Sequence, residues 1–417
     1  MTSIEKKSSV PRVSIRAFVQ FRSPARVACV ICALVWAFSP SEFFAQTSQR
    51  KAKPSQLDAD VSLKRDPSSG DLHLVEKHAS PASPAAKEAG TAHALRVRVN
   101  LVPVNCNVFA PDGTSVAGLG RDDFRIYQDR FEQRVAYFDA GNDPASVALI
   151  IDASPSVVPE AAAMEGVAKS LAEILAPRDD VAVVEFSAHS YVLLPFSRDR
   201  DQLVEAISRV DVRGLFGDTG GSNIYETVYL TAAKLFHGRT GRKAILLLTD
   251  GEDSGLGLSL DRTIAAPTSS ETPTKLTFDD VVRALSADGV EAYIVSTQNR
   301  PHIMTDEWLA AHGNETLLSE AVREKGIPAY TLFLAELVRR AGGGLYFLRE
   351  TQSGRDAFAR IAGNIRTQYT LGFYPAGEVA ARPGWHSMRV EVVRHDGGGP
   401  VRAVSRSAYY VSAPSSQ

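Results

Sequence analysis

The stretch VALIIDASPS, residues 147–156, joins a run of apolar β-forming residues to a loop of small, oxygen-bearing residues. A second stretch, AILLLTD at 244–250, repeats this pattern, because an acidic residue again ends an apolar run. Such runs are typical of strands that are buried on both faces of a parallel sheet. Between them the segment GGSN, which contains Ser222, precedes a helical pattern. We therefore expect Asp152 and Asp250 at the carboxyl ends of two buried strands, with the Ser222 hydroxyl on a loop.

Strand and helix patterns alternate from residue 145 to residue 368, which favours an α/β fold with a mostly parallel, doubly wound sheet. The expected strands are 147–152, 181–187, 190–196, 244–250, 291–297 and 344–348. The expected helices are 157–176, 200–210, 224–236, 277–289, 332–343 and 353–368. Only two residues join strand 181–187 to strand 190–196, so this pair must be antiparallel. In a doubly wound sheet the strand order reverses between two neighbours, and the strands ending in Asp152 and Asp250 are the expected pair.

Residues 95–143 and 369–412 instead carry short patterns of alternating apolar and polar residues, with turns such as Asp112-Gly113. Neither segment has enough strands to close a core alone. We predict that the two segments pack together into one small β-sandwich, with the α/β region inserted between them. Cys106, the one cysteine beyond the N-terminal leader, is expected to be a small buried hydrophobe rather than a reactive thiol.

Residues 1–45 indicate export. Basic residues precede the apolar run VACVICALVWAF at 27–38, and the small residue Ala45 follows it. The run is short for a bilayer span, so a cleaved signal peptide and an uncleaved signal anchor both stay open, and only the uncleaved form would contact a membrane. The expected location is the periplasm, the cell envelope or the extracellular space. Residues 46–94 are rich in Ser, Ala, Pro and Lys and are predicted to be a disordered linker.

Composition and missing motifs exclude several functions. The 417 residues carry 46 basic and 48 acidic side chains, so the charge balance makes no case for nucleic acid as a partner. No Gly-x-Gly-x-x-Gly follows the first strand, and no phosphate loop or His-Glu-x-x-His motif is present. Ser154 has no evident general base within its motif. We therefore predict that the protein is not an enzyme.

The oxygen-bearing residues after the two buried strands favour a metal site. Taken singly, Asp-x-Ser-x-Ser and Thr-Asp-Gly are also ordinary turns or helix N-caps. In this order, after these elements, they supply the hard oxygen ligands that suit Mg²⁺, with Mn²⁺ and Ca²⁺ as alternatives. A helix that begins near Val157 would aim its N-terminal amides at the same place. Neutral hydroxyl ligands would leave the ion poorly neutralised, so a carboxylate from another protein is the expected further ligand.

This constellation resembles the metal-ion-dependent adhesion site of von Willebrand factor A-type domains, in order, spacing and strand context over residues 145–368. The chain also resembles a bacterial family of exported proteins in which such a domain lies between β segments. The resemblance implies binding of Mg²⁺ and of protein ligands without chemistry. It maps the metal ligands, in loop order, to Asp152, Ser154, Ser156, Ser222 and Asp250. The family usually has Thr at the second-loop position, so Ser222 keeps the hydroxyl but loses the methyl group that stiffens χ1. Pro155, which lacks a backbone donor, replaces the Gly often seen in the first loop.

The favoured function is an exported, adhesion-type module that captures an acidic side chain of a protein partner through bound Mg²⁺. The alternative is a structural component of the cell envelope, whose site is degenerate or whose ion only stabilises the fold. A metal-assisted hydrolase is disfavoured, because the sequence offers no identifiable general base.

Two insertions, 254–276 and 298–330, follow strands on the metal side of the sheet. Binding loops collect on that side, so both are predicted to shape or cover the ligand surface, with plain spacers as the alternative. Glu252 and Asp253 are expected to be loop acids rather than direct metal ligands.

Overall fold

The computed structural model describes most of the chain beyond the first 53 residues. The described residues are 54–59, 61–65, 72–76, 101–141, 143–210, 221–255, 276–312, 316–319, 326–349, 354–375, 382–395 and 398–411. The predicted export signal at 1–45 lies outside them. Within these ranges, no helix is long and apolar enough to cross a membrane.

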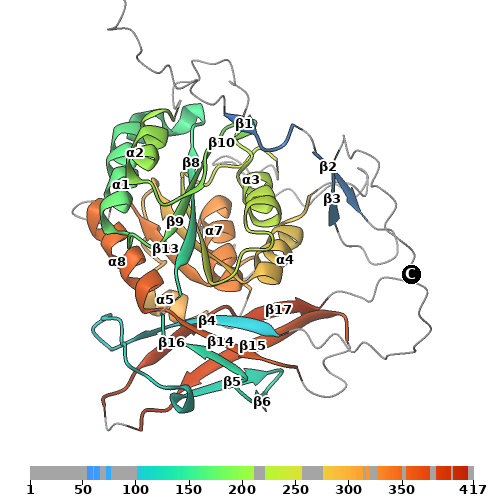
Figure 1. Ribbon diagram of the computed structural model, residues 1–417, viewed down its shortest axis with the longest axis vertical. Helices are drawn as coiled ribbons and strands as arrows, with labels where there is room; N and C mark the ends of the chain where they lie inside the picture. The colour runs from blue at the N-terminus through green and yellow to red at the C-terminus, as the bar shows by residue number, and fades with distance from the viewer. Residues whose placement is uncertain are drawn as a thin grey trace, which may run out of the picture. The chain divides into compact units, whose positions relative to one another are not determined.

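A seven-stranded sheet forms the centre of the α/β part, in the order β1-β10-β9-β8-β11-β12-β13 (Figure 1). Strands β9, β8, β11, β12 and β13 are parallel, and β10 is antiparallel to both of its neighbours. Their bounds are Ser55–Gln56 (β1), Ala145–Asp152 (β8), Asp180–Phe186 (β9), Ser190–Ser197 (β10), Arg242–Thr249 (β11), Val290–Ser296 (β12) and Gly343–Phe347 (β13). Strands β8 and β11 are neighbours, so the expected reversal of strand order and the antiparallel pair are both confirmed.

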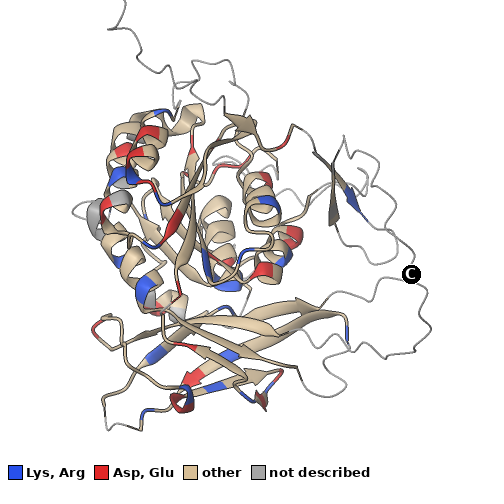
Figure 2. Ribbon diagram, viewed as in Figure 1, with Lys and Arg blue, Asp and Glu red and all other residues tan. Residues whose placement is uncertain are grey.

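Helices cover both faces of this sheet because its strands are apolar on both sides. Along β8, Leu149 joins the core beneath α1, α2 and α8, whereas Ile150 joins the core beneath α3, α4 and α7. The helices are Ala161–Ile174 (α1), Arg200–Ser208 (α2), Ile224–Leu230 (α3), Phe278–Asp288 (α4), Ala329–Ala341 (α7) and Gly354–Thr367 (α8). Acidic and basic residues are interspersed on these outer helices (Figure 2). The doubly wound α/β fold is therefore confirmed.

Strands from both ends of the α/β region make up two further antiparallel sheets, β16-β4-β14-β7 and β17-β15-β5-β6. The strands are Val102–Phe109 (β4), Phe124–Gln128 (β5), Phe131–Gln133 (β6), Tyr137–Asp139 (β7), Tyr369–Phe373 (β14), Gly384–Val392 (β15), Arg402–Ser405 (β16) and Ala408–Val411 (β17). One shared core joins the two sheets, with Cys106 of β4 and Ile126 of β5 both fully buried in it. The predicted sandwich of N-terminal and C-terminal strands is confirmed, as is the buried position of Cys106.

The sandwich lies against the amino ends of the parallel strands. Asn105 Nδ2 donates to the carbonyl of Gly289, just before β12, at 3.2 Å. Asn107 Nδ2 donates to the Tyr293 hydroxyl at 3.1 Å. Arg406, between β16 and β17, donates through Nη1 to the carbonyl of Ser286 at the end of α4, at 2.8 Å. The carboxyl ends of the strands, where Asp152 lies, are therefore at the end of the sheet that faces away from the sandwich (Figure 1).

Part of the predicted linker at 46–94 is folded, so that prediction is wrong for the described residues between 54 and 76. Strand β1 pairs with β10 and forms the edge of the central sheet, and Leu57 beside it is only 5% exposed. An antiparallel hairpin follows, formed by β2 (Val61–Arg65) and β3 (Leu72–Glu76). Arg65 of this hairpin binds Asp280 of α4 through two hydrogen bonds of 3.0 and 2.6 Å. Each alternating run is at most five residues long, too short to stand out from its polar surroundings.

Candidate metal centre

Asp152, the last residue of β8, is fully buried. Its Oδ1 accepts hydrogen bonds from the backbone N–H of Ser154 at 2.9 Å and from the Ser154 hydroxyl at 2.5 Å. The Ser154 Oγ lies 3.0 Å from the Oγ of Ser156. The other carboxylate oxygen, Oδ2, accepts the hydroxyl of Thr249 at 2.6 Å. The structure thus gathers the first loop around one carboxylate and links that carboxylate to the end of β11.

Asp250 follows β11 directly and is 2% exposed. Its Oδ1 accepts the backbone N–H of Glu252 at 2.9 Å, in a turn that orients the carboxylate. The loop that follows Asp250 also forms hydrogen bonds with the loop that contains Ser222. The Ser222 N–H donates to Ser254 Oγ at 3.1 Å, and the Ser254 N–H donates to the carbonyl of Ser222 at 2.7 Å. Gly221 has a φ of 87°, and a Cβ there would lie 2.7 Å from Ser254 Oγ, so this close contact requires glycine.

The hydroxyl of Ser222 is buried and has no hydrogen-bond partner among the described residues. Buried hydroxyls are nearly always paired, since leaving one unpaired costs about 1–3 kcal/mol. The backbone of Ser222 is fixed by Ser254 on both its N–H and its carbonyl, so a loose loop does not explain the missing partner. A bound cation, which accepts an oxygen lone pair, would supply that partner.

Burial, and to a smaller extent the negative charge of Asp250, raise the pKa of Asp152 to about 7. Hydrogen bonds from Ser154 and Thr249 act in the opposite direction, because they stabilise the ionised carboxylate. Asp250 follows Thr249, whose hydroxyl binds Asp152, so the two carboxylates belong to adjoining loops. Two carboxylates in a shared buried site repel, and a divalent cation between them would remove that cost.

The predicted ligands offer two carboxylates and three hydroxyls. Asp152, Ser154, Ser222 and Asp250 are buried, whereas Ser156 is exposed. In the described part of the chain, no group of three or more His, Cys, Asp or Glu side chains could hold a metal ion. A centre at this place therefore depends on hydroxyl oxygens as well as carboxylates. Such hard donors suit Mg²⁺, Mn²⁺ or Ca²⁺, so the residues present fit these ions.

The helix expected from Val157 starts later than predicted. Residues Pro155–Glu160 form a 3-10 helix, and α1 begins at Ala161. Pro155 and Pro159 both lack a backbone N–H, so regular α-helical hydrogen bonding cannot extend through this turn. The predicted start of the α-helix near Val157 was therefore wrong, and the direction of its N-terminal amides stays a prediction.

Sequence reasoning missed the supporting roles of Thr249 and Ser254, which orient Asp152 and Ser222 respectively. Asp253 is also buried, at 2% exposure, and its Oδ1 accepts the N–H of Tyr225 in the first turn of α3 at 3.3 Å. All three lie within a few residues of Asp250. Their closeness to a proposed ligand was the signal that could have identified them.

The described part of the second insertion covers an edge of the sheet. Met304, Leu317 and Ile327 are buried in a small core with residues of α7 and with Phe347 of β13. This core also includes residues of α5, a short helix spanning Asp306–Ala311. Most of the first insertion, residues 256–275, lies outside the described residues. A role for either insertion at the ligand surface stays a prediction.

A family model described as von Willebrand factor type A domain matches residues 147–252. The match begins within β8 and ends just beyond Asp250, so it contains all five predicted ligands. The chain contains a von Willebrand factor A-type domain. No curated protein matches the chain.

Several solved structures match parts of the chain. The conserved hypothetical protein BatB from Bacteroides thetaiotaomicron is 17% identical, with 36% of this chain and 66% of that chain covered and a TM-score of 0.27. A von Willebrand factor type A protein from Catenulispora acidiphila is 14% identical, with 70% and 72% covered and a TM-score of 0.34. Proximal thread matrix protein 1 from the mussel byssus, solved with a zinc-occupied MIDAS motif, is 13% identical, with 57% and 48% covered and a TM-score of 0.36. The family assignment therefore rests on the family model and on the fold described above.

Proposed function

We propose that this protein is an exported, divalent-metal-dependent binding module, in which the A-type domain holds Mg²⁺ and captures a carboxylate of a partner protein. The ion would be held by Asp152, Ser154, Ser156, Ser222 and Asp250. The observation that carries the proposal is the unpaired, buried hydroxyl of Ser222, held by hydrogen bonds to the loop that follows one of two buried carboxylates. Export to the periplasm, the cell envelope or the extracellular space is supported by the basic and apolar leader within residues 1–45.

The residues of the site divide into ligands and residues that hold them in place. Thr249 orients Asp152 through a 2.6 Å hydrogen bond, and Ser254 fixes the backbone of Ser222. The hydroxyl ligands carry no charge, and with Asp152 and Asp250 acting partly through water, a bound divalent ion would keep a net attraction for an anionic oxygen. That attraction is what the ion would supply when bound, and the acidic side chain of a partner has the matching charge.

The arrangement favours binding over catalysis. Among the described side chains, those that donate hydrogen bonds to Asp152 are the hydroxyls of Ser154 and Thr249. A hydrolytic role would need a positioned general base in addition to these groups. We therefore propose no reaction for this site.

Thermal unfolding of the full chain tests the metal site directly. Wild type and Asp250→Asn would be titrated with Mg²⁺, Mn²⁺, Ca²⁺ and EDTA. A ligand that binds only the native state raises the melting temperature in a saturable way. We expect such a rise for wild type and its loss in Asp250→Asn, which keeps the size of the side chain but removes its charge.

A second measurement separates partner capture from a purely structural role. Proteins retained by the immobilised chain in Mg²⁺ would be compared with those retained in EDTA and by Asp250→Asn. Retention that requires both the ion and Asp250 supports the binding module. Retention that survives chelation, in a protein that the metal nevertheless stabilises, would favour the envelope scaffold instead.

A further inference from the structure

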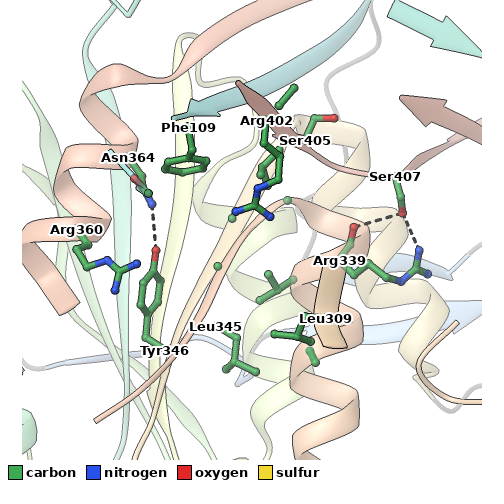
Figure 3. A pocket seen from close by; sticks show the side chains of 18 of the residues that line it. Phe109, Leu309, Arg339, Leu345, Tyr346, Arg360, Asn364, Arg402, Ser405 and Ser407 are labelled. Carbon is green, nitrogen blue, oxygen red and sulfur yellow. Dashed lines mark hydrogen bonds between the residues drawn. The ribbon is translucent and has the colours of Figure 1, made fainter. Parts of the chain in front are cut away.

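A cavity of about 800 Å³ lies where β13, the edge strand of the central sheet, meets the sandwich (Figure 3). Its walls come from α7, β13 and α8 on one side and from β15 and β16 on the other, with part of the second insertion. None of the five proposed metal ligands lines it. Its volume falls in the range of sites for small molecules, about 300–1,000 Å³.

The lining of this cavity is strongly basic. Five arginines contribute to it, and none of the described lining residues is Asp or Glu. The arginines are Arg300, Arg339, Arg360, Arg389 and Arg402. Two of them are already neutralised nearby, because Arg339 binds Glu336 at 2.5 Å and Arg389 binds Glu391. The charges of Arg360 and Arg402 make the cavity attractive to an anion.

Arg360 of α8 and Arg402 of β16 are the two arginines best placed to bind such an anion. Neither has a carboxylate partner in the described part of the chain. Their guanidinium groups instead lie beside aromatic rings, each 5.9 Å from the ring centre of Tyr346 and of Phe109 respectively. Figure 3 shows both side chains directed toward the cavity from opposite walls. Guanidinium groups offer paired N–H donors that match the oxygens of a carboxylate or phosphate.

The other end of the cavity includes aliphatic side chains. Leu309 of the insertion and Leu345 of β13 lie there (Figure 3), and Leu317 of the insertion and Val338 of α7 also line the cavity. Burial of an apolar group against such a surface favours binding, because it removes apolar area from water. A ligand that satisfies both ends therefore needs an anionic group joined to a compact apolar group.

We propose that this cavity binds a small organic anion, a carboxylate or a phosphate monoester, whose anionic group contacts Arg360 and Arg402 and whose apolar part packs against the leucines. The site is separate from the metal centre, which lies at the carboxyl ends of the strands. Its ligand bridges the A-type domain and the sandwich, because α8 supplies one arginine and β16 supplies the other. Binding is independent of divalent metal.

The proposal is tested by isothermal titration calorimetry of the full chain at low ionic strength, in EDTA. Phenyl phosphate and phenylacetate serve as the two anionic probes, and their relative affinities distinguish a phosphate from a carboxylate ligand. Inorganic phosphate lacks the apolar group and phenol lacks the charge. We expect saturable binding of at least one of the aromatic anions, and weaker binding of both half-probes.

Matched variants locate the binding. Arg402→Gln and Arg360→Gln are each expected to raise the dissociation constant about tenfold, because each variant loses one charge-assisted contact. Arg389→Gln is the control, because this arginine lines the same cavity but is paired with Glu391. Thermal unfolding establishes that each variant is folded. Absence of saturable binding to either aromatic anion would overturn the proposal, as would equal weakening in Arg389→Gln and Arg402→Gln.

Discussion

The hydroxyl of Thr249, at the end of β11, donates a 2.6 Å hydrogen bond to Oδ2 of Asp152, at the end of β8. The same hydroxyl oxygen accepts the backbone N–H of Gly251 at 3.0 Å. One side chain therefore fixes both the carboxylate of the first loop and the start of the third. Because β8 and β11 are the neighbours at which the strand order reverses, this bond spans the crevice where ligands bind in doubly wound sheets.

Replacing Thr249 by Val should destabilise the protein by about 1–3 kcal/mol, because the buried Asp152 oxygen and the Gly251 N–H both lose their partner. It should also weaken metal binding without removing a proposed ligand. Urea unfolding, with and without Mg²⁺, measures both effects. Thr249→Ser keeps the hydroxyl and should lie near wild type. If Thr249→Val matches wild type in both measurements, the Thr249–Asp152 hydrogen bond contributes neither to stability nor to metal binding.

The N-terminal strand gives a second prediction. Leu57 is 5% exposed and packs into the same core as α3, and its carbonyl accepts a hydrogen bond from Lys234 at 2.5 Å. Truncation to Ala should destabilise the native state by about 2–5 kcal/mol, as expected for a buried leucine. Val75→Ala, in the neighbouring hairpin at 41% exposure, is the matched control and should change little. Equal effects of the two substitutions would mean that β1 is not part of the folded core.

The central sheet could be predicted because its strands are buried on both faces and so appear as unbroken apolar runs, such as residues 147–151 and 244–248. The loops that carry the proposed metal ligands could be located because each follows such a run or precedes a helix. The junction with the sandwich could not be predicted. Arg406 binds Ser286, which is 120 residues away in the sequence, and neither residue lies in a recognisable motif. The unpaired Ser222 hydroxyl is likewise a property of packing that no sequence pattern reveals.

Glu291, near the start of β12, carries a third prediction. It is 3% exposed, and burial raises the pKa of its carboxyl from 4.5 to about 7, against hydrogen bonds from Tyr293 and Gln368 and the charge of Arg406. Between pH 4.5 and 7 the folded protein keeps a proton that the unfolded chain releases. Stability must therefore fall as pH rises through this window, by about 3 kcal/mol from this group, and level off above it.

Urea unfolding of wild type and Glu291→Gln across pH 4 to 8 measures this contribution. The variant should show a shallower fall than wild type, because Gln does not titrate and can still accept the Tyr293 hydroxyl, which lies 2.9 Å from Glu291 Oε2. The part of the fall that remains is the contribution of Asp152, whose pKa is also raised to about 7. Glu165→Gln, which removes an exposed partner of Lys169, is the control and should retain the wild-type profile. If Glu291→Gln loses stability with rising pH as steeply as wild type, another group is responsible.

Ser222→Ala separates the metal site from the stability of the fold. Because the Ser222 hydroxyl has no described partner, removing it breaks no hydrogen bond and eliminates a buried unpaired polar group. In EDTA the variant should therefore be as stable as wild type, or more stable by about 1 kcal/mol. In saturating Mg²⁺ the order should reverse, since the variant lacks an oxygen ligand and gains less stability from the ion.

Ser190→Ala is the control. The buried hydroxyl of Ser190 lies 2.6 Å from Thr227 Oγ1, so this variant should lose stability equally with and without metal. Thermal and urea unfolding of the three proteins, each in EDTA and in Mg²⁺, measure these differences. A Ser222→Ala protein with an unchanged response to Mg²⁺ would remove this hydroxyl from the ligand set and with it the main support for the metal centre.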